Sequence, residues 1–326
     1  MPLLFIALQL ITACAAQKPT GALAYVSNER DGTITVIDTQ TDSVVNTIKV
    51  GARPRGIRLS PDGRRVYVAL STPSGQEYKD ADNRIAAIDV ESGQVAALYD
   101  VGSDPEQLAV SLDGKLLYAS NENAGTASVT DVQTGRLLST LMVGIEPEGV
   151  TISPDGRWVY VTSETSNTVS VIDTQTNQVV GVSLVGARPR DTAFSADSSR
   201  AFVTAEVGTN LSVIDTATHR VIKTVELPRG DGVKPMGVVV SSDGRKIYVA
   251  NGRAGTVSVI DAATYDIINT IPVGRRVWGL AMTADGRKVY TANGLSNDVS
   301  VIDTSTDKVI KTIKAGDGPW GIAIGR

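Results

Sequence analysis

The chain has 326 residues, with 31 basic and 35 acidic side chains, a net charge of −4, one His and one Cys. A single Cys excludes an intramolecular disulfide framework and a Cys-rich zinc site, and a single His excludes a His-rich metal centre. A hydrophobic content of 42% with 20% charged residues excludes general disorder. The acidic balance, without runs of Lys or Arg, argues against broad nucleic-acid binding.

The first sixteen residues predict an exported protein. Residues 2–16 read PLLFIALQLITACAA and suit the apolar core of a secretory signal, although no Lys or Arg precedes them. They fall short of the roughly 20 residues that span a membrane. The run Ile11-Thr12-Ala13-Cys14 resembles a bacterial lipobox, so Cys14 is a candidate lipidation site, and ordinary cleavage is the open alternative. We expect a leader over 1–16, a linker over 17–21, and a periplasmic protein without a transmembrane span once mature, soluble or anchored through Cys14.

The rest of the chain repeats one unit. A short hydrophobic run ending in Asp, usually Ile-Asp-Thr, recurs about every 42 residues. A second marker, Ser-x-Asp-Gly and its variants, keeps the same period. The seven Asp residues of the first marker are Asp38, Asp89, Asp131, Asp173, Asp215, Asp261 and Asp303.

Each unit contains four short β-runs, for example residues 149–153, 158–162, 168–173 and 178–185. Four strands per period of this length are typical of a propeller blade. We therefore predict an all-β, seven-bladed β-propeller with four-stranded antiparallel blades over residues 22–326.

The order of the strands predicts how the ring closes. The chain opens at a second strand, near residues 24–27, and ends just after a first strand, near residues 321–324. The closing blade must therefore combine a C-terminal inner strand with three N-terminal strands, which removes the open edge of the ring.

The runs Tyr-Val-Thr-Ser at 160–163 and Tyr-Val-Ala-Asn at 248–251, each followed by Ser-Val-Ile-Asp, resemble the YVTN-type β-propeller repeat. Residues 25–31, 143–166 and 274–300 more narrowly resemble the propeller proteins associated with PQQ-dependent alcohol catabolism. This resemblance implies an exported protein encoded near transport and quinoprotein alcohol-oxidation genes, and it implies no particular reaction.

Candidate site residues lie on the loops that enter the inner strands and on those that join the second strand to the third, because both sets surround one mouth of the channel. The sequence places acidic residues in one sector of this mouth and basic and aromatic residues in the opposite arc. The acidic sector holds Asp104, Glu106, Glu122, Glu146, Glu148 and Glu164, and the basic arc holds Arg188, Arg190, Lys234, Arg276, Trp278, Trp320, Arg53 and Arg55. Glu29, Glu206, Asn251 and Asn293 are further candidates for ligand binding.

Two interpretations of this mouth stay open. The arginines could pair with acidic neighbours in a surface network, or the basic aromatic arc could bind a planar anion such as the carboxylated quinone PQQ. The acidic sector could hold Ca²⁺, but no compact calcium loop occurs, so we assign no metal and no other cofactor. Segments 72–82 and 228–235 exceed the repeat length, and both are expected to overhang this face.

His219 falls four residues after Asp215, at the turn between the third and fourth strands, so we expect it to be exposed on the opposite face. This position removes the obvious general base from the mouth. The Asp that recurs at the end of each third strand is expected to cap that turn.

Three functions remain open. The first is an exported binding or scaffold protein, a monomer without nucleic acid, whose partner is a quinoprotein dehydrogenase, a cytochrome or a transport component. The second is a lyase, hydrolase or isomerase that uses Glu122, Glu148 and Glu164. The third is a DNA-binding or surface-adhesion propeller.

Overall fold

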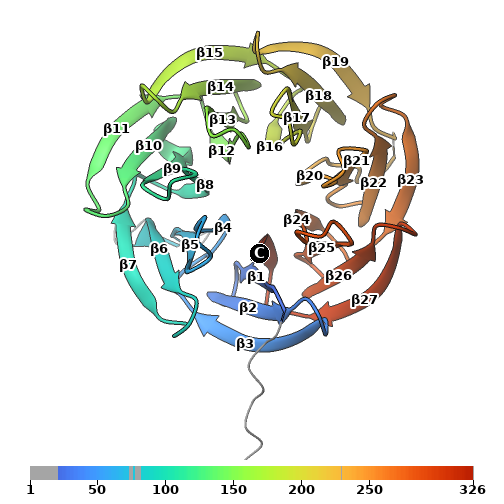
Figure 1. Cartoon of the computed structure of the whole chain (residues 1–326), viewed down its shortest axis with the longest axis horizontal. Coiled ribbons are helices and arrows are strands. Elements are labelled where there is room, and N and C mark those ends of the chain that lie inside the picture. The colour runs from blue at the N-terminus through green and yellow to red at the C-terminus, as the bar shows by residue number, and fades with distance from the viewer. Residues whose placement is uncertain (1–20, 73–75, 78–81, 229, 326) are drawn as a thin grey trace, which may run out of the picture.

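The computed structural model describes residues 21–72, 76–77, 82–228 and 230–325. The leader, Cys14 and most of the segment 72–82 lie outside these described residues. The described chain forms seven sheets of four antiparallel strands arranged in a ring (Figure 1). The predicted all-β, seven-bladed propeller is therefore confirmed.

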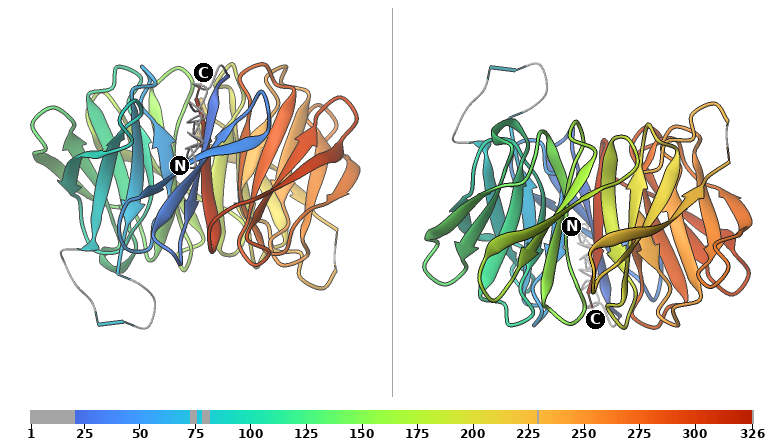
Figure 2. Two further views of the ribbon diagram at one scale, coloured as in Figure 1. Left: turned by 90° about the horizontal axis from the view of Figure 1, so that it is seen from below. Right: turned by 90° about the horizontal axis from the view of Figure 1, so that it is seen from above.

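The chain runs outward through each blade, from an inner strand at the channel to an outer strand at the rim of the disc (Figures 1 and 2). We call β4–β7, β8–β11, β12–β15, β16–β19, β20–β23 and β24–β27 blades 1 to 6, and β28 with β1–β3 the closing blade. The inner strands are β4 (Ile57–Leu59), β8 (Pro105–Val110), β12 (Pro147–Ile152), β16 (Pro189–Phe194), β20 (Val238–Val240), β24 (Val277–Met282) and β28 (Pro319–Ile324). The second strands are β5 (Arg65–Leu70), β9 (Leu116–Asn121), β13 (Trp158–Ser163), β17 (Arg200–Ala205), β21 (Lys246–Ala250), β25 (Lys288–Asn293) and β1 (Leu23–Asn28).

The third and outer strands complete the blades. The third strands are β6 (Arg84–Asp89), β10 (Thr126–Asp131), β14 (Thr168–Asp173), β18 (Asn210–Asp215), β22 (Thr256–Asp261), β26 (Asp298–Asp303) and β2 (Thr33–Asp38). The outer strands are β7 (Val95–Asp100), β11 (Leu137–Met142), β15 (Gln178–Leu184), β19 (Arg220–Glu226), β23 (Ile267–Pro272), β27 (Lys308–Lys314) and β3 (Ser43–Lys49). A single turn of 3-10 helix, η2 (Glu122–Ala124), follows β9.

The ring closes as the sequence predicts. The C-terminal strand β28 pairs with the N-terminal strand β1, with Tyr25 opposite Ala323 and Asn28 opposite Pro319. The sheet order β28-β1-β2-β3 joins both ends of the described chain in one blade.

The core lies between the blades, where the second and third strands stack. Val, Ile and Tyr side chains of these strands pack with Ala and other apolar side chains of the neighbouring blade. Tyr118, Tyr160, Tyr248 and Tyr290 are fully buried. Burial of each such side chain stabilises the fold by about 1.5–3 kcal/mol. Since these clusters lie between blades, the hydrophobic effect holds each blade to its neighbours.

The third-strand Asp residues cap turns, as expected. The Oδ1 atom of Asp173 accepts hydrogen bonds from the backbone N–H groups of Gln175 and Thr176, at 2.8 and 3.2 Å. The equivalent Asp215 and Asp261 make similar bonds, so these recurring carboxylates serve the blade rather than a site.

A side-chain hydroxyl links neighbouring inner strands around the channel. The Gly149 N–H donates to Thr162 Oγ1 at 2.8 Å, and Thr162 Oγ1 donates to the carbonyl of Arg190 in the next blade at 3.0 Å. Where alanine replaces the hydroxyl residue, as at Ala69, the strands bond directly, and the Gly56 N–H donates to the Glu106 carbonyl at 2.9 Å. The hydroxyls of Ser27, Ser120 and Thr204 repeat the Thr162 link.

Candidate functional site

Seven side chains at the start of the inner strands fill the channel. In ring order they are Arg55, Glu106, Glu148, Arg190, Met236, Trp278 and Trp320, which we call the channel ring. Trp278 and Trp320 stack with their ring centroids 6.0 Å apart, and the guanidinium of Arg55 lies 5.4 Å from the Trp320 ring. Glu106 is fully buried and Trp320 is 7% exposed.

A small cavity remains beside the channel ring, lined by residues that include Gln107, Asp191 and Trp320. Its volume is about 40 Å³. Since each buried water needs at least about 10–15 Å³ of such space, the cavity has room for a few waters and not for an organic substrate. This cavity is therefore too small for a ligand of drug size.

The first arginine pair binds carboxylates on both sides. Arg53 bonds Glu29 at 3.2 Å and Asp104 at 2.7 Å, and Arg55 bonds Glu29 at 2.9 Å and also pairs with Glu106. Their side chains are only 10% and 14% exposed. This network joins the closing blade to blades 1 and 2 across the mouth.

The second arginine pair repeats the arrangement. Arg190 bonds Glu206 at 2.7 Å and pairs with Glu148 and Glu164, and Arg188 also contacts Glu164 and Glu206. The ion-pair interpretation of the sequence therefore describes Arg53, Arg55, Arg188 and Arg190. These four guanidinium groups are not free to form the basic arc, because the acidic sector and its neighbours already hold them.

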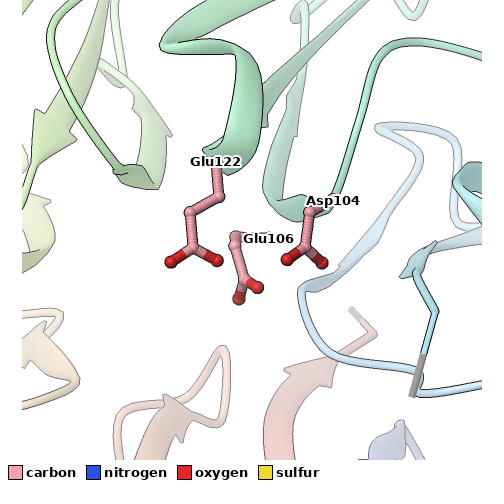
Figure 3. Close-up of side chains that lie close together, drawn as sticks. All are labelled: Asp104, Glu106 and Glu122. Atoms are coloured by element: carbon pink, nitrogen blue, oxygen red, sulfur yellow. The ribbon is translucent and has the colours of Figure 1, made fainter. Parts of the chain in front are cut away.

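The carboxyl groups of Asp104, Glu106 and Glu122 point toward the same space (Figure 3), with their nearest ligand atoms within 4.8 Å of one another. Burial, followed by the charge of Glu148, raises the pKa of Glu122, and burial also raises the pKa of Glu106. Carboxylates of this kind suit Ca²⁺. Two of the three, however, already accept hydrogen bonds from Arg53 and Arg55, so a guanidinium supplies the positive charge here.

The opposite pKa shifts of Glu148 and Glu164 favour one proton bound to the pair. Burial opposes ionisation of Glu148, but Arg190, a hydrogen bond from Glu164 and Arg55 outweigh it and hold the pKa of Glu148 below its usual range. Burial and the Glu148 charge raise the pKa of Glu164 to about 9. The pair thus holds one carboxylate and one carboxylic acid, but their side chains are only 7% and 2% exposed.

A pocket of about 670 Å³ opens at the mouth between the closing blade, blade 1 and blade 6. We call it the mouth pocket. Five of the predicted site residues line it, together with Arg30, Asp31, Leu295 and Gln76, one of the described residues of the long segment 72–82. The five are Glu29, Arg53, Arg55, Arg276 and Trp278.

Arg276 is the cation of the mouth pocket that has no carboxylate partner among the described residues. Its guanidinium lies over Trp278, 4.5 Å from the ring centroid. Burial lowers the pKa of Arg276, and the neighbouring Arg253 lowers it further. Lys234, Arg253 and Arg275 also form no ion pair with a described carboxylate, so the unpaired positive charge gathers on blades 5 and 6.

Two candidate residues have a different role. The Asn251 amide donates to Thr256 and Ser258, each at 2.9 Å, and the Asn293 amide donates to Asp298 and Ser300. Both side chains join the second strand to the third inside a blade and are about 1% exposed or less. The blade uses the amide donors of both residues, and their assignment to ligand binding stays a prediction.

The sequence reasoning missed Gln107 and Asp191, whose side chains line the small channel cavity. Both residues directly follow a channel-ring residue, and the other five blades have glycine at this position. A Cβ there meets the backbone of the next inner strand; at Gly149 it would lie 2.4 Å from the carbonyl oxygen of Arg190. The departure from glycine in two blades was the signal that could have identified them. Burial raises the pKa of Asp191.

His219 lies on the rim opposite the mouth, but it is half-buried and not exposed as expected. Its Nδ1 shares a hydrogen bond of 2.8 Å with the hydroxyl of Tyr160, and its ring meets Trp158 edge-on at 4.6 Å. The prediction of exposure was wrong because the turn of blade 4 packs against the second strand of blade 3.

Among the described residues, none of the helical segments has the length and hydropathy to cross a bilayer.

Two family models match the chain. Residues 9–199 match the model described as choice-of-anchor I domain, and residues 196–320 match the model described as cytochrome D1 heme domain. The boundary between the two matches falls inside blade 4 of the continuous ring.

Curated relatives match only one segment. Proteins described as uncharacterized protein YncE from Salmonella typhi and Salmonella typhimurium are 36% identical over 61 residues, 19% of this chain. The match spans 17% of the length of these relatives.

Solved structures match nearly the whole ring. Hydrazine synthase of Kuenenia stuttgartiensis superposes with a TM-score of 0.72 at 22% identity, over 83% of this chain and 89% of that one. A functionally unknown protein from Desulfotomaculum acetoxidans superposes with a TM-score of 0.76 at 19% identity, over 93% and 98%. At these identities the likeness concerns the fold alone.

Proposed function

The chain belongs to the choice-of-anchor I domain family, and we propose that it is an exported binding protein that recognises a planar anion in the mouth pocket. The name of the family refers to an anchor, and the matched range includes Cys14, the candidate lipidation site. Export and attachment through Cys14 are therefore part of the proposal.

The observation that carries the proposal is the position of Arg276 on Trp278. A guanidinium stacked on an indole presents a flat cationic surface whose donors are fixed in one plane. Because Arg276 has no carboxylate partner among the described residues, its donors are available to an anion. A carboxylate or phenolate on a planar ligand would complete this arrangement.

The rest of the mouth pocket supports the same ligand class. Glu29 accepts hydrogen bonds from both Arg53 and Arg55, at 3.2 and 2.9 Å, so its charge is offset. A volume of about 670 Å³ lies within the roughly 300–1,000 Å³ of small-molecule sites. The cavity beside the channel ring, at about 40 Å³, is much smaller than this range, so the mouth pocket is the better candidate site.

PQQ is the specific ligand to test, because the chain resembles propeller proteins associated with PQQ-dependent alcohol catabolism and PQQ is a planar, carboxylated quinone. In this setting the partner of the protein would be a quinoprotein dehydrogenase, a cytochrome or a transport component. Co-purification of such a component from cells grown on alcohol, lost on substitution of mouth residues, would support the partner.

Titration of tryptophan fluorescence with PQQ tests the ligand directly, since Trp278 lines the pocket. We expect saturable quenching, with a dissociation constant that rises at least tenfold in Arg276→Gln and in Trp278→Ala. Arg275→Gln is the matched control, because Arg275 is adjacent and does not line the pocket. Absence of saturable quenching, or equal quenching in all three variants, would reject the proposal.

A haem is the other cofactor that the matches bring up, through the cytochrome D1 heme domain model. Haem iron takes a His, Cys, Met or Tyr ligand. The described residues that line the mouth pocket include none of these, and His219 lies on the opposite rim bonded to Tyr160. The residues therefore do not fit a haem at the mouth, and we assign it no role.

The enzyme hypothesis has one supporting observation, the shared proton of Glu148 and Glu164, because a carboxylic acid beside a carboxylate can act as an acid–base pair. Both side chains are almost fully buried and pair with Arg190, and the cavity that Glu148 lines is too small for an organic substrate. We therefore favour a structural role for this pair.

A further inference from the structure

The outer strands of two neighbouring blades lack charge and expose apolar side chains. Strand β15 exposes Val180, Val182 and Leu184, by 52%, 61% and 74%, and β11 exposes Leu138 and Met142, by 39% and 74%. β11 and β15 lie side by side on the rim (Figure 1). We call these two strands the apolar rim.

The other rim strands differ in charge or in exposure. β3 and β7 also expose valine or leucine, but β3 ends in Lys49 and β7 in Asp100. β27 carries Lys308, Lys311 and Lys314, and β19 carries Arg220, Lys223 and Glu226. Charged residues on an edge strand are a common protection against pairing with another sheet. β23 is also uncharged, but of its large side chains it exposes only Ile268, and it ends in Pro272, which has no N–H to donate.

We propose that β15 is a dimer interface, at which two copies of this chain pair their β15 strands antiparallel across a two-fold axis. As an edge strand, β15 has one side whose backbone N–H and C=O groups have no strand partner in the blade. A second copy supplies those groups in matching order. This surface is separate from the mouth pocket, so the inference does not rest on the proposed ligand.

The charge pattern favours a second copy as the occupant. An antiparallel pair centred on Val182 places Val180 opposite Leu184, and every residue from 178 to 186 is uncharged, so no like charges meet. The same pairing of β27, centred on Lys311, would bring Lys308 opposite Lys314 and the two Lys311 residues together. Self-pairing is therefore open to β15 and opposed by repulsion at β27.

The side chains would add to the backbone bonds. Val182 and Leu184 alternate with Ser183 and project from one face of β15, and the exposed Val180 lies at the β-bulge of this strand, between Val179 and Gly181. In the pair, the three exposed apolar residues of β15 from each copy would form one continuous apolar strip, with Leu138 and Met142 of β11 beside it. Closed two-fold symmetry uses the same patch on both copies and leaves no free edge at this strand.

Sedimentation velocity over a concentration series tests the proposal on the purified protein. We expect a dimer whose dissociation constant rises at least tenfold in Val182→Lys. Thr224→Lys is the matched control, because Thr224 of β19 pairs with Ser212 of β18 as Val182 of β15 pairs with Ser170 of β14. A monomer at all concentrations, or equal weakening by both substitutions, would overturn the proposal.

Disulfide trapping gives a second measurement that does not depend on a folding defect. In a Cys14→Ser background, V182C places two thiols opposite each other at the two-fold axis, so mild oxidation should give a covalent dimer. T224C should give none. Equal cross-linking of both variants would show random collision and would also overturn the proposal.

Discussion

The hydroxyl of Tyr160 and the Nδ1 atom of His219 share a hydrogen bond of 2.8 Å across the seam between blades 3 and 4. Other seams repeat this contact on the rim opposite the mouth. Tyr118 bonds Asn177 at 2.7 Å and Tyr248 bonds Asp307 at 2.8 Å, in each case joining a second-strand tyrosine to the outer turn of the next blade. We call this contact the tyrosine latch.

The latch at His219 predicts a dependence of stability on pH. Burial, followed by the charge of Arg157, lowers the pKa of His219 below its usual value. The imidazole of His219 therefore binds a proton more readily in the unfolded chain than in the folded protein. As a result, the free energy of unfolding falls as the pH drops below about 6.5. His219→Asn, which copies the latch of Asn177, should remove this component. Urea unfolding between pH 5 and 8 measures it, and a constant difference between wild type and variant would contradict it.

The seam between blades 1 and 2 lacks a latch. The position equivalent to His219 is Gly135, beside which a Cβ would meet nothing within 4 Å, and a groove of about 650 Å³ that includes Tyr67 opens at this seam. Gly135 has φ 70°, and the non-glycine residues Asn177 and His219 adopt φ 52° and 55° at the same position.

Gly135→Asn should therefore install a latch to Tyr67 and raise the free energy of unfolding by about 0.5–1.5 kcal/mol, the usual contribution of one hydrogen bond. Thermal and urea unfolding measure the change. Gly63→Asn is the control, because Gly63 has φ 69° and equally open surroundings but belongs to a different turn. An equal effect of both substitutions would assign it to the loss of glycine and not to the latch.

Removal of residues 319–326 should open the ring. The deletion removes β28, and with it the pairing to β1 and the Trp320 side chain of the channel ring. The closing blade would lose its inner strand and expose an unpaired edge. We therefore expect the full chain to unfold in one cooperative thermal transition, followed by circular dichroism, and the deletion variant to lose that transition. A chain that ends at Ile324 serves as the control, and an unchanged transition in the longer deletion would disprove the role of β28.

The shared proton of Glu148 and Glu164 predicts the opposite pH dependence from that of His219. Burial and the charge of Glu148 raise the pKa of Glu164 to about 9, so the folded protein keeps a proton that the unfolded chain releases near pH 4.5. Its contribution to stability is therefore present in acid and is lost as the pH rises through 9.

Glu164→Gln should be progressively more stable than wild type as the pH rises from about 5 to 9, because glutamine has no proton to lose. Glu146→Gln, on the exposed loop that enters the same blade, should leave the slope unchanged. Parallel unfolding curves of wild type and Glu164→Gln across this range would show that Glu164 is ionised in the folded protein.

The repeat itself determined most of the fold. Two markers with one period, four β-runs in each unit and a chain that opens at a second strand were enough to predict seven blades and the closure by β28, because a blade is a local unit whose hydrophobic pattern is written within about 42 residues. The loop positions followed from the same frame, and so did the gathering of Glu29, Arg53, Arg55, Arg276 and Trp278 at one mouth.

Only the tertiary structure decided which of these charges are available. Pairing depends on distances between side chains of different blades, and these distances are not encoded in the spacing of residues along the chain. The structure pairs Arg53, Arg55, Arg188 and Arg190 with carboxylates, and among the described residues Arg276 has no carboxylate partner and lies on Trp278. The single His likewise proved to be a half-buried latch. A composition with one His and a net charge of −4 thus conceals a mouth whose free positive charge lies on blades 5 and 6.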